Sequence, residues 1–224
     1  MTESETLDKL GVTSEGLSSQ QADSLLEKHG KNVLEESKKK SVFQVFLSQF
    51  ADLMVIILII AAIVSMFSGS VESTIVIFAV ITLNAILGTV QHVKAEKSLE
   101  SLKSLSSPSA KVIRDGRKIE IDSENIVPGD IVVLEAGDLV VADGRIINNY
   151  SLQVNESSLT GESTNIDKSV ETIEKEVPLA DRTDMVFSGS LVTYGRAIVV
   201  VTETGMNTEI GKIATLMNQA DRKS

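Results

Sequence analysis

The sequence predicts a mixed membrane protein: a two-helix transmembrane hairpin joined to an all-β, jelly-roll-like domain with flanking helices. Two observations support this prediction. Apolar residues concentrate between Leu53 and Val90, and beyond Pro108 their spacing changes from a helical period to a period of two. We therefore expect an N-terminal helical segment over residues 1–40, a hairpin with a helical stalk over 41–107, and a β domain over 108–224.

The composition of the 224-residue chain excludes several classes of site. It contains no cysteine, so a disulfide framework and a thiolate-based zinc or redox site are both excluded. The formal net charge of −10 argues against a nucleic-acid partner, because such proteins bind phosphates through Lys and Arg. His29 lies at an expected helix end and His92 has no partner His or Cys, so we assign no metal site.

The N-terminal segment is expected to contain a short helix with one packing face. Between Ser18 and His29, apolar residues recur at helical spacing. Ser18 and Gln21 can form a capping box, and Gly30 provides a stop.

Two apolar stretches, Leu53–Phe67 and Ser73–Val90, are expected to cross a membrane. With its run-in from Phe50, the first approaches the roughly 20 residues needed to cross about 30 Å of hydrocarbon, and the second does so by itself. The alternative is a buried helical hairpin of a soluble protein. It is disfavoured because Asn84 and the loop residue Glu72 are the only strongly polar interruptions.

Lysines on the flanks set the expected orientation of this hairpin. Lys38–Lys40 precede the first stretch, Lys94, Lys97 and Lys103 follow the second, and the connecting loop has no Lys or Arg. The positive-inside tendency then places both termini and the β domain in the cytoplasm. We expect a multi-pass protein of the cell membrane, with the lipid bilayer as a partner.

The segments next to the two stretches allow alternatives. Apolar residues at helical spacing from Val42 to Phe50 indicate either a segment in the membrane interface or a plain continuation of the first helix. Asp52 either lies near an ion path or caps this helix, and capping is favoured. Asn84 is expected to pack between helices rather than bind an ion. The second helix is expected to continue as a stalk to Leu105.

Beyond Pro108, short runs of alternating residues predict β-strands. A hairpin is expected around the turn Asp115-Gly116. The expected strands are Ala110–Arg114, Lys118–Asp122, Ile131–Leu134, Arg145–Asn148, Leu152–Asn155, Met185–Phe187 and Ala197–Thr202. A final helix is expected over Thr208–Gln219, with these residues facing inward: Ile210, Ile213, Ala214 and Met217.

One loop of the β domain carries candidate chemistry, from Asn155 to Ser163. Gly161 allows a sharp turn, and Glu162 is presented at the tip beside the hydroxyl residues Thr160 and Ser163. Such a carboxylate can orient and deprotonate a water molecule if the loop docks on an electrophile held elsewhere. A Thr-Gly-Glu-Ser tetrapeptide alone is weak evidence, because most such loops are ordinary turns.

Ten segments, in this order along the chain, together resemble the membrane-hairpin and actuator-domain part of calcium-pump-like P-type ATPases. Two departures from that family pattern are Asn155, where Asp is usual, and Val141, where Pro is usual. The segments are Gly16–Ser18, Gly30–Leu34, Gln49–Leu53, Asn84–Gly88, Ala95–Leu102, Val127–Ile131, Ala136–Asp143, Leu159–Ser163, Phe187–Ser190 and Thr204–Ala214.

The resemblance implies a mechanism divided between domains. In the family, ATP phosphorylates an Asp in a separate domain, and the Thr-Gly-Glu-Ser loop then directs water onto the aspartyl phosphate. By this resemblance Glu162 positions water, Thr160, Gly161 and Ser163 shape and dock the loop, and the turn Pro128–Asp130 is structural. The resemblance further implies a complete pump whose phosphorylation and nucleotide domains bind ATP and magnesium outside this chain.

Two classes of function remain open at the level of sequence. The first is the N-terminal part of an ATP-driven cation transporter, with calcium the first candidate ion and heavy metals disfavoured because cysteine is absent. The second is a truncated, non-catalytic membrane protein that uses the actuator fold as a regulatory or interaction module. The 224 residues contain no Asp-Lys-Thr-Gly-Thr phosphorylation motif and no nucleotide site is assigned, and by resemblance they stop before a third membrane helix.

Overall fold

The computed structural model describes residues 2–34, 41–105, 108–175 and 177–221. The chain divides into two compact units, one formed by Met1–Glu35 with Ser107–Ser224 and the other by Glu36–Ser106. The sequence predicts residues 1–40 as a separate N-terminal segment. In the structure, the helices near the N-terminus instead belong to the same unit as the β domain.

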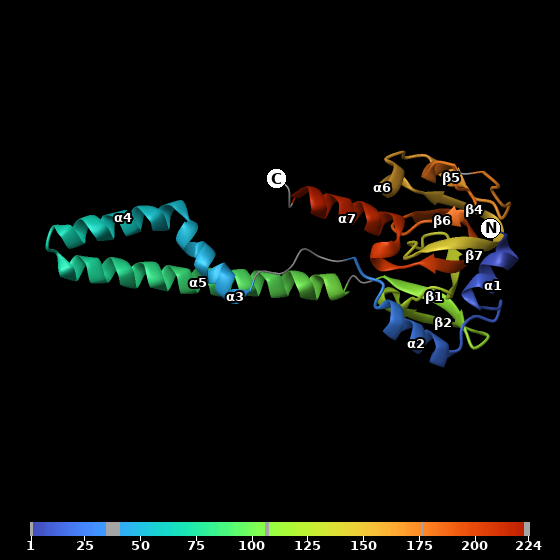
Figure 1. Cartoon of the computed structure of the whole chain (residues 1–224), viewed down its shortest axis with the longest axis horizontal. Helices are drawn as coiled ribbons and strands as arrows, with labels where there is room; N and C mark the ends of the chain where they lie inside the picture. The colour runs from blue at the N-terminus through green and yellow to red at the C-terminus, as the bar shows by residue number, and fades with distance from the viewer. Residues whose placement is uncertain (1, 35–40, 106–107, 176, 222–224) are drawn as a thin grey trace. The chain divides into compact units, whose positions relative to one another are not determined.

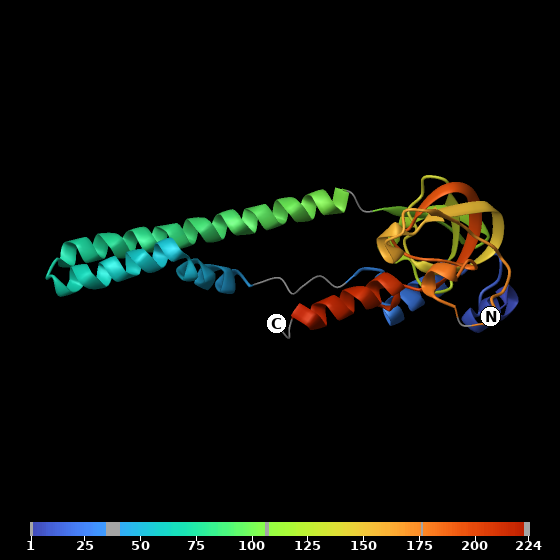
Figure 2. The same cartoon turned by 90° about the horizontal axis from the view of Figure 1, so that it is seen from above.

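Seven strands form a single antiparallel sheet in the order β2-β1-β3-β7-β4-β5, with β6 paired to β4. The sequence predicts an all-β, jelly-roll-like domain, and the structure shows a mostly β domain built on one antiparallel sheet, which is strongly curved in Figure 2. The strands are β1 (Ser109–Arg114), β2 (Arg117–Asp122), β3 (Ile131–Glu135), β4 (Asp143–Asn155), β5 (Asn165–Asp167), β6 (Met185–Val186) and β7 (Leu191–Glu203).

Strands β4, β5 and β7 differ from the sequence prediction, and β7 extends over Leu191–Glu203 where Ala197–Thr202 is expected. The runs Arg145–Asn148 and Leu152–Asn155 were expected to be separate strands, but both belong to β4. Shifts of register where β4 pairs with β7 carry the strand through the irregular residues between the two runs. The three-residue strand β5 was not predicted, because Asn165–Asp167 has almost no alternating pattern of its own.

The N-terminal helices α1 (Glu3–Leu10) and α2 (Ser19–His29) pack on this sheet. The predicted capping box is confirmed, since Gln21 N donates to Ser18 Oγ at 3.2 Å, and Gly30 ends α2 as expected. Apolar residues from these helices and the segment between them meet the sheet in one cluster, whose buried members are Val12, Leu17, Ala22, Val127, Ile131, Ile147 and Val200.

Asn32 ties the segment after α2 to the β domain. Its Nδ2 donates to Ser123 O at 3.0 Å and Val141 O at 2.8 Å, and Gly205 N donates to its Oδ1 at 2.7 Å. One side-chain amide thus joins three separate backbone segments.

A buried ion pair stabilises the turn before β3. Arg114 donates to the Asp130 carboxylate through Nε at 2.8 Å and through a terminal nitrogen at 2.6 Å. Asp130 also accepts a hydrogen bond from Val127 N at 2.9 Å, and its side chain has no exposed surface. The turn Pro128–Asp130 therefore has the structural role expected from the sequence.

The second unit consists of α3 (Val42–Ser48), a short 3₁₀ turn, α4 (Leu53–Phe67) and α5 (Val71–Leu105). Helices α4 and α5 lie side by side in both views (Figures 1 and 2), with Ala62, Ile81, Ala85 and Thr89 buried within the unit. Only α5 among the described helices is long and apolar enough to span a membrane alone. The segments Val42–Ala51 and Leu53–Phe67 meet that test together but are bent by 66°.

The bend bears on one alternative left by the sequence, and a hydrogen bond at Asp52 bears on another. The bend excludes a plain continuation of the first apolar helix toward the N-terminus. Asp52 lies at the bend and caps α4, because its Oδ1 accepts a hydrogen bond from Met54 N at 2.9 Å.

Helix α5 continues to Leu105, as the stalk prediction expected. Asn84 is exposed within the described residues, so no packing partner for it is seen in this chain, and Lys38–Lys40 lie outside them.

The last helix, α7 (Glu209–Asp221), projects from the β domain (Figures 1 and 2). Ile213 and Met217 are predicted from the sequence to face inward, but their side chains are 40% and 66% exposed, so the prediction is wrong for these two residues. The first turn of α7 is anchored to the domain by a hydrogen bond from Glu209 N to the Asp143 carboxylate, whereas Leu216 and Met217 further along are 65% and 66% exposed. Helical periodicity identified the apolar face but could not show what covers it.

Candidate functional site

The four residues singled out by the sequence lie together in the loop between β4 and β5. These strands pair up to Asn155, which lies opposite Asn165, so the loop is closed at its base by a β ladder. A single helical turn, α6 (Ser157–Thr160), occupies the first part of the loop. Thr160 is partly exposed, and Gly161, Glu162 and Ser163 are exposed.

Gly161 ends α6 in a left-handed conformation, with φ at 77°. A Cβ at this position would contact nothing within 4 Å, so the requirement for glycine comes from the backbone angle rather than from space. The Gly161 N–H donates to Ser157 O at 3.0 Å. This turn directs the chain so that Glu162 follows at the exposed tip.

Hydrogen bonds within the loop fix the backbone on both sides of Glu162. Glu162 N donates to Thr160 Oγ1 at 3.3 Å, and Thr160 Oγ1 donates to Glu156 O at 3.1 Å. Asn155 Nδ2 donates to Ser163 O at 3.2 Å, while its Oδ1 accepts from Ser157 N at 3.1 Å. Asn155 therefore uses both ends of its amide, and an Asp could not donate the bond to Ser163.

Just before α6, Glu156 is completely buried and forms an ion pair with Lys168, which is also buried. Burial raises the pKa of Glu156 and lowers that of Lys168, because the low-dielectric interior disfavours both charged forms. Lys168 is a residue of the site that sequence reasoning missed. Alternation could have indicated its buried partner, because Leu152, Val154 and Glu156 are spaced two residues apart at the end of β4 and just beyond it.

Other segments of the sequence pattern converge behind the loop. Ser158 Oγ donates to Gly189 O at 2.9 Å, joining α6 to the Phe187–Ser190 segment. Asp143 accepts hydrogen bonds from Ser188 N and Glu209 N, each at 2.8 Å. Burial raises the pKa of Asp143 in spite of these two bonds. The loop is therefore backed by a connected set of polar contacts.

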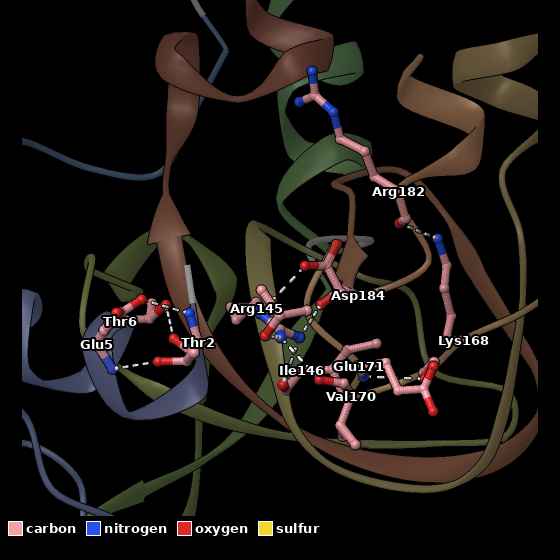
Figure 3. A network of polar contacts seen from close by, with 12 residues as sticks. Thr2, Glu5, Thr6, Arg145, Ile146, Lys168, Val170, Glu171, Arg182 and Asp184 are labelled. Carbon is pink, nitrogen blue, oxygen red and sulfur yellow. Dashed lines mark hydrogen bonds and ion pairs between the residues drawn. The ribbon is translucent and has the colours of Figure 1, made fainter. Parts of the chain in front are cut away.

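The connection from β5 to β6 is held by Arg145, a buried residue of β4 (Figure 3). Its guanidinium donates to Asp184 O at 2.8 Å, to Ile146 O at 3.1 Å and to Val170 O at 2.9 Å. Its Nε also lies 3.5 Å from the Asp184 carboxylate. Arg145 thereby fixes the irregular segment that follows Lys168.

The site is an exposed tip on a supported loop rather than a pocket. Among the described residues, no group of three or more His, Cys, Asp or Glu side chains could hold a metal ion. A shallow depression of about 690 Å³ lies elsewhere on the sheet, lined in part by Tyr150, Tyr194 and Arg196. It includes none of the loop residues. The arrangement can present a carboxylate and hydroxyl groups to a surface that approaches from outside.

Comparison with known proteins defines the class of this chain. Residues 104–218 match the family model of the P-type ATPase actuator domain, and residues 1–65 match the N-terminal model of cation transporters and ATPases. The chain therefore belongs to the P-type ATPase family.

Its relatives include proteins described as calcium-transporting ATPases. The chain is 48% identical over 219 residues to one from Listeria monocytogenes, covering 98% of this chain and 25% of the relative. It is 46% identical to calcium-transporting ATPase 1 of Lactococcus lactis, with the same coverage. A probable cation-transporting ATPase F of Mycobacterium tuberculosis is 39% identical, over 92% of this chain and 23% of the relative. The chain thus spans about a quarter of the length of these relatives.

Proposed function

We propose that this chain is part of an ATP-driven cation pump, with calcium as the transported ion, and that its Thr160–Ser163 loop directs water onto an aspartyl phosphate held in another domain. The observation that carries the proposal is the position of Glu162, an exposed carboxylate at the tip of a loop whose backbone is hydrogen-bonded on both sides. The names of the relatives support calcium as the ion.

The proposed chemistry needs a partner surface, which suits the geometry of the loop. Glu162 would accept a proton from the attacking water as general base and orient that water toward phosphorus. Thr160 and Ser163 would contact the docked surface, and Gly161 would allow close approach of the backbone. ATP and magnesium would be bound by the phosphorylation and nucleotide domains of the complete pump. Their role would be to form the aspartyl phosphate on which the loop acts.

We further propose that α4 and α5 cross the membrane as a hairpin with both ends in the cytoplasm. Most apolar side chains of the two helices are exposed in this chain, among them Leu53 at 73% and Phe67 at 89%. Apolar surface of this extent is rare on soluble monomers and is expected where lipid covers the protein. The bilayer, the other pump domains and the cation would then be the partners of this chain.

The test is Glu162→Gln in the complete pump. The change removes the proton acceptor but keeps the size of the side chain, so phosphorylation from ATP should continue while phosphoenzyme decay slows on the order of 10²–10⁴-fold. The measurement is the decay rate of radiolabelled, acid-stable phosphoenzyme during a chase with unlabelled ATP.

Glu171→Gln provides the matched control, because Glu171 is an exposed glutamate like Glu162 but lies in the β5–β6 connection, outside the Glu162 loop. Its phosphoenzyme should decay at the wild-type rate. A wild-type decay rate in Glu162→Gln would show that the water-directing residue has been assigned wrongly.

A further inference from the structure

The loop that carries Glu162 rests on a buried ion pair that the proposed chemistry does not use. Lys168 Nζ lies 2.5 Å from Glu156 Oε1, and both side chains have 0% exposure. Apart from this ammonium group, neither carboxylate oxygen of Glu156 has a hydrogen-bond donor within the described ranges. The buried carboxylate therefore depends on a single partner.

This ion pair joins the start of the loop to the residue that follows β5. Glu156 is the first residue after β4, and Lys168 is the first residue after β5. Alternation along the two strands turns both side chains toward the core, where Leu152, Val154 and Ile166 also pack. The segment between Glu156 and Lys168, including Glu162, is consequently clamped at its base from the inside.

Hydrogen bonds connect the backbone of Glu156 to the tip of the loop. Glu156 O accepts hydrogen bonds from Leu159 N and Thr160 N, both at 2.9 Å, and from the Thr160 hydroxyl at 3.1 Å. The same hydroxyl accepts a hydrogen bond from Glu162 N at 3.3 Å. A displacement of Glu156 would therefore move α6 and, with it, Glu162.

Lys168 is itself held by the domain behind the loop. Its ammonium nitrogen lies 3.4 Å from Arg182 O (Figure 3) and 5.5 Å from the centre of the Phe187 ring. Its backbone N donates to Leu152 O at 3.0 Å. Through Lys168, the start of the loop is thus connected to β4 and to the segments around Arg182 and Phe187.

We propose that Glu156 and Lys168 are positioning residues for dephosphorylation, and that their ion pair holds Glu162 where it can orient the attacking water. This inference rests on the function proposed above for Glu162. Removing one partner leaves the other charge buried and unpaired, and the loop base must rearrange to reach water. Because a displacement of about 1 Å can cost on the order of 10²-fold in rate, a small shift at the base suffices.

The test uses the complete pump with Glu156→Gln, Lys168→Met and the two changes combined. Each single change should slow phosphoenzyme decay on the order of 10-fold to 100-fold, less than Glu162→Gln, while phosphorylation from ATP proceeds. Because the two side chains act as one unit, the double variant should decay no more slowly than the slower single variant. If the factor by which decay slows in the double variant equals the product of the two single factors, the inference is overturned.

The decay rate per phosphorylated site separates positioning from folding. Arg114→Gln breaks another buried ion pair of the same domain, in which Arg114 and Asp130 are 2.6 Å apart and 10% and 0% exposed. It should reduce the number of phosphorylatable sites but leave the decay rate of each site unchanged. Equal slowing in Arg114→Gln would mean general destabilisation and would overturn the inference.

Glu162→Gln, measured alongside, distinguishes failure of this inference from failure of the proposed function. Slow decay in Glu162→Gln with wild-type decay in both single variants of the pair would overturn the positioning role and leave the proposed function standing. Wild-type decay in Glu162→Gln would remove the proposed function and this inference together.

Discussion

At the scale of single residues, Gly195 shows how closely two strands of the sheet approach each other. It lies in β7 with φ at 75°, opposite an irregular part of β4 in which Ser151 also has a positive φ of 54°. A Cβ on Gly195 would lie 2.1 Å from Ser151 O and 2.6 Å from Tyr150 O. Both atoms belong to the backbone, so neither can move aside at low cost.

Gly195→Ala should therefore destabilise the β domain by at least about 3 kcal/mol, because steric overlap adds to the strain of a left-handed residue. Gly137→Ala is the matched control. Gly137 also has a positive φ, 96°, but a Cβ there would meet nothing within 4 Å, so its cost should be about 1–2 kcal/mol. Thermal unfolding of the chain in detergent, followed by circular dichroism, measures both. Equal losses would show that β4 shifts to accommodate the methyl group.

At the scale of elements, charged side chains join β1, β2 and the end of β3. Lys111 of β1 contacts Glu135 at 2.7 Å and Asp138 at 3.3 Å, and Lys118 of β2 contacts Glu135 at 3.1 Å. Hydrogen bonds from Lys111 and Lys118 lower the pKa of Glu135 to about 2. These contacts are partly exposed to solvent, so their effect on stability depends on pH and salt.

The lowered pKa of Glu135 predicts a direction for the pH dependence. Between the ordinary value of 4.5 and about 2, the unfolded chain binds a proton at Glu135 that the folded chain does not. The stabilisation is therefore complete above about pH 4.5 and is lost as the pH falls toward about 2. The melting temperature of the wild-type chain should fall more over this range than that of Lys111→Met/Lys118→Met.

Salt provides the control for the electrostatic cause. The difference between the two chains should shrink in about 1 M salt, where the Debye length is about 3 Å. If the melting temperatures of the two chains fall equally with pH at low salt, Glu135 makes no such contribution to stability.

At the scale of the whole molecule, the chain combines two units that differ in whether their aliphatic side chains are buried or exposed. In the β domain, alternating residues enclose a core of buried aliphatic side chains, such as Val112, Ile146 and Val154. In the hairpin unit, α4 buries only Ala62 and exposes most of its aliphatic side chains. The β domain buries its apolar side chains as a domain in water does, and we propose that lipid surrounds the hairpin unit.

The proposed topology predicts where each unit lies in a cell. A reporter active only in the cytoplasm and fused after Ser224 should be active, because lysines flank the hairpin on both sides and the loop between its helices has none. Protease added outside spheroplasts should leave the β domain intact. A fusion that reports an external location would contradict the positive-inside argument.

Local features of the fold were predictable because they depend on residues close together in the chain. The Ser18–Gln21 capping box, the cap at Asp52 and the turn at Asp115-Gly116 are all decided within a few residues. The loop containing Glu162 belongs to the same group, because Gly161 marks its turn and hydroxyl residues surround the carboxylate. Its exposed position agrees with the expectation, whereas its chemical role stays a prediction.

Features that depend on distant partners were not predictable in this way. Strand β5 exists because it pairs with β4, and the two halves of β4 are continuous because both pair with β7. The apolar face of α7 was identified correctly as a pattern, but its exposure depends on how far the helix extends from the sheet. In each case, the outcome depends on contacts made by cooperative folding rather than on local preference.

The sequence by itself determined the two kinds of surface, the positions of most strands and turns, and the loop that presents Glu162. Periodicity and turn chemistry encode these features locally. Only the tertiary structure decided that Glu156 and Lys168, 12 residues apart, share one buried contact beneath that loop. The physical reason is that a buried charge needs a partner in space, and the pairing of β4 with β5 brings that partner to it.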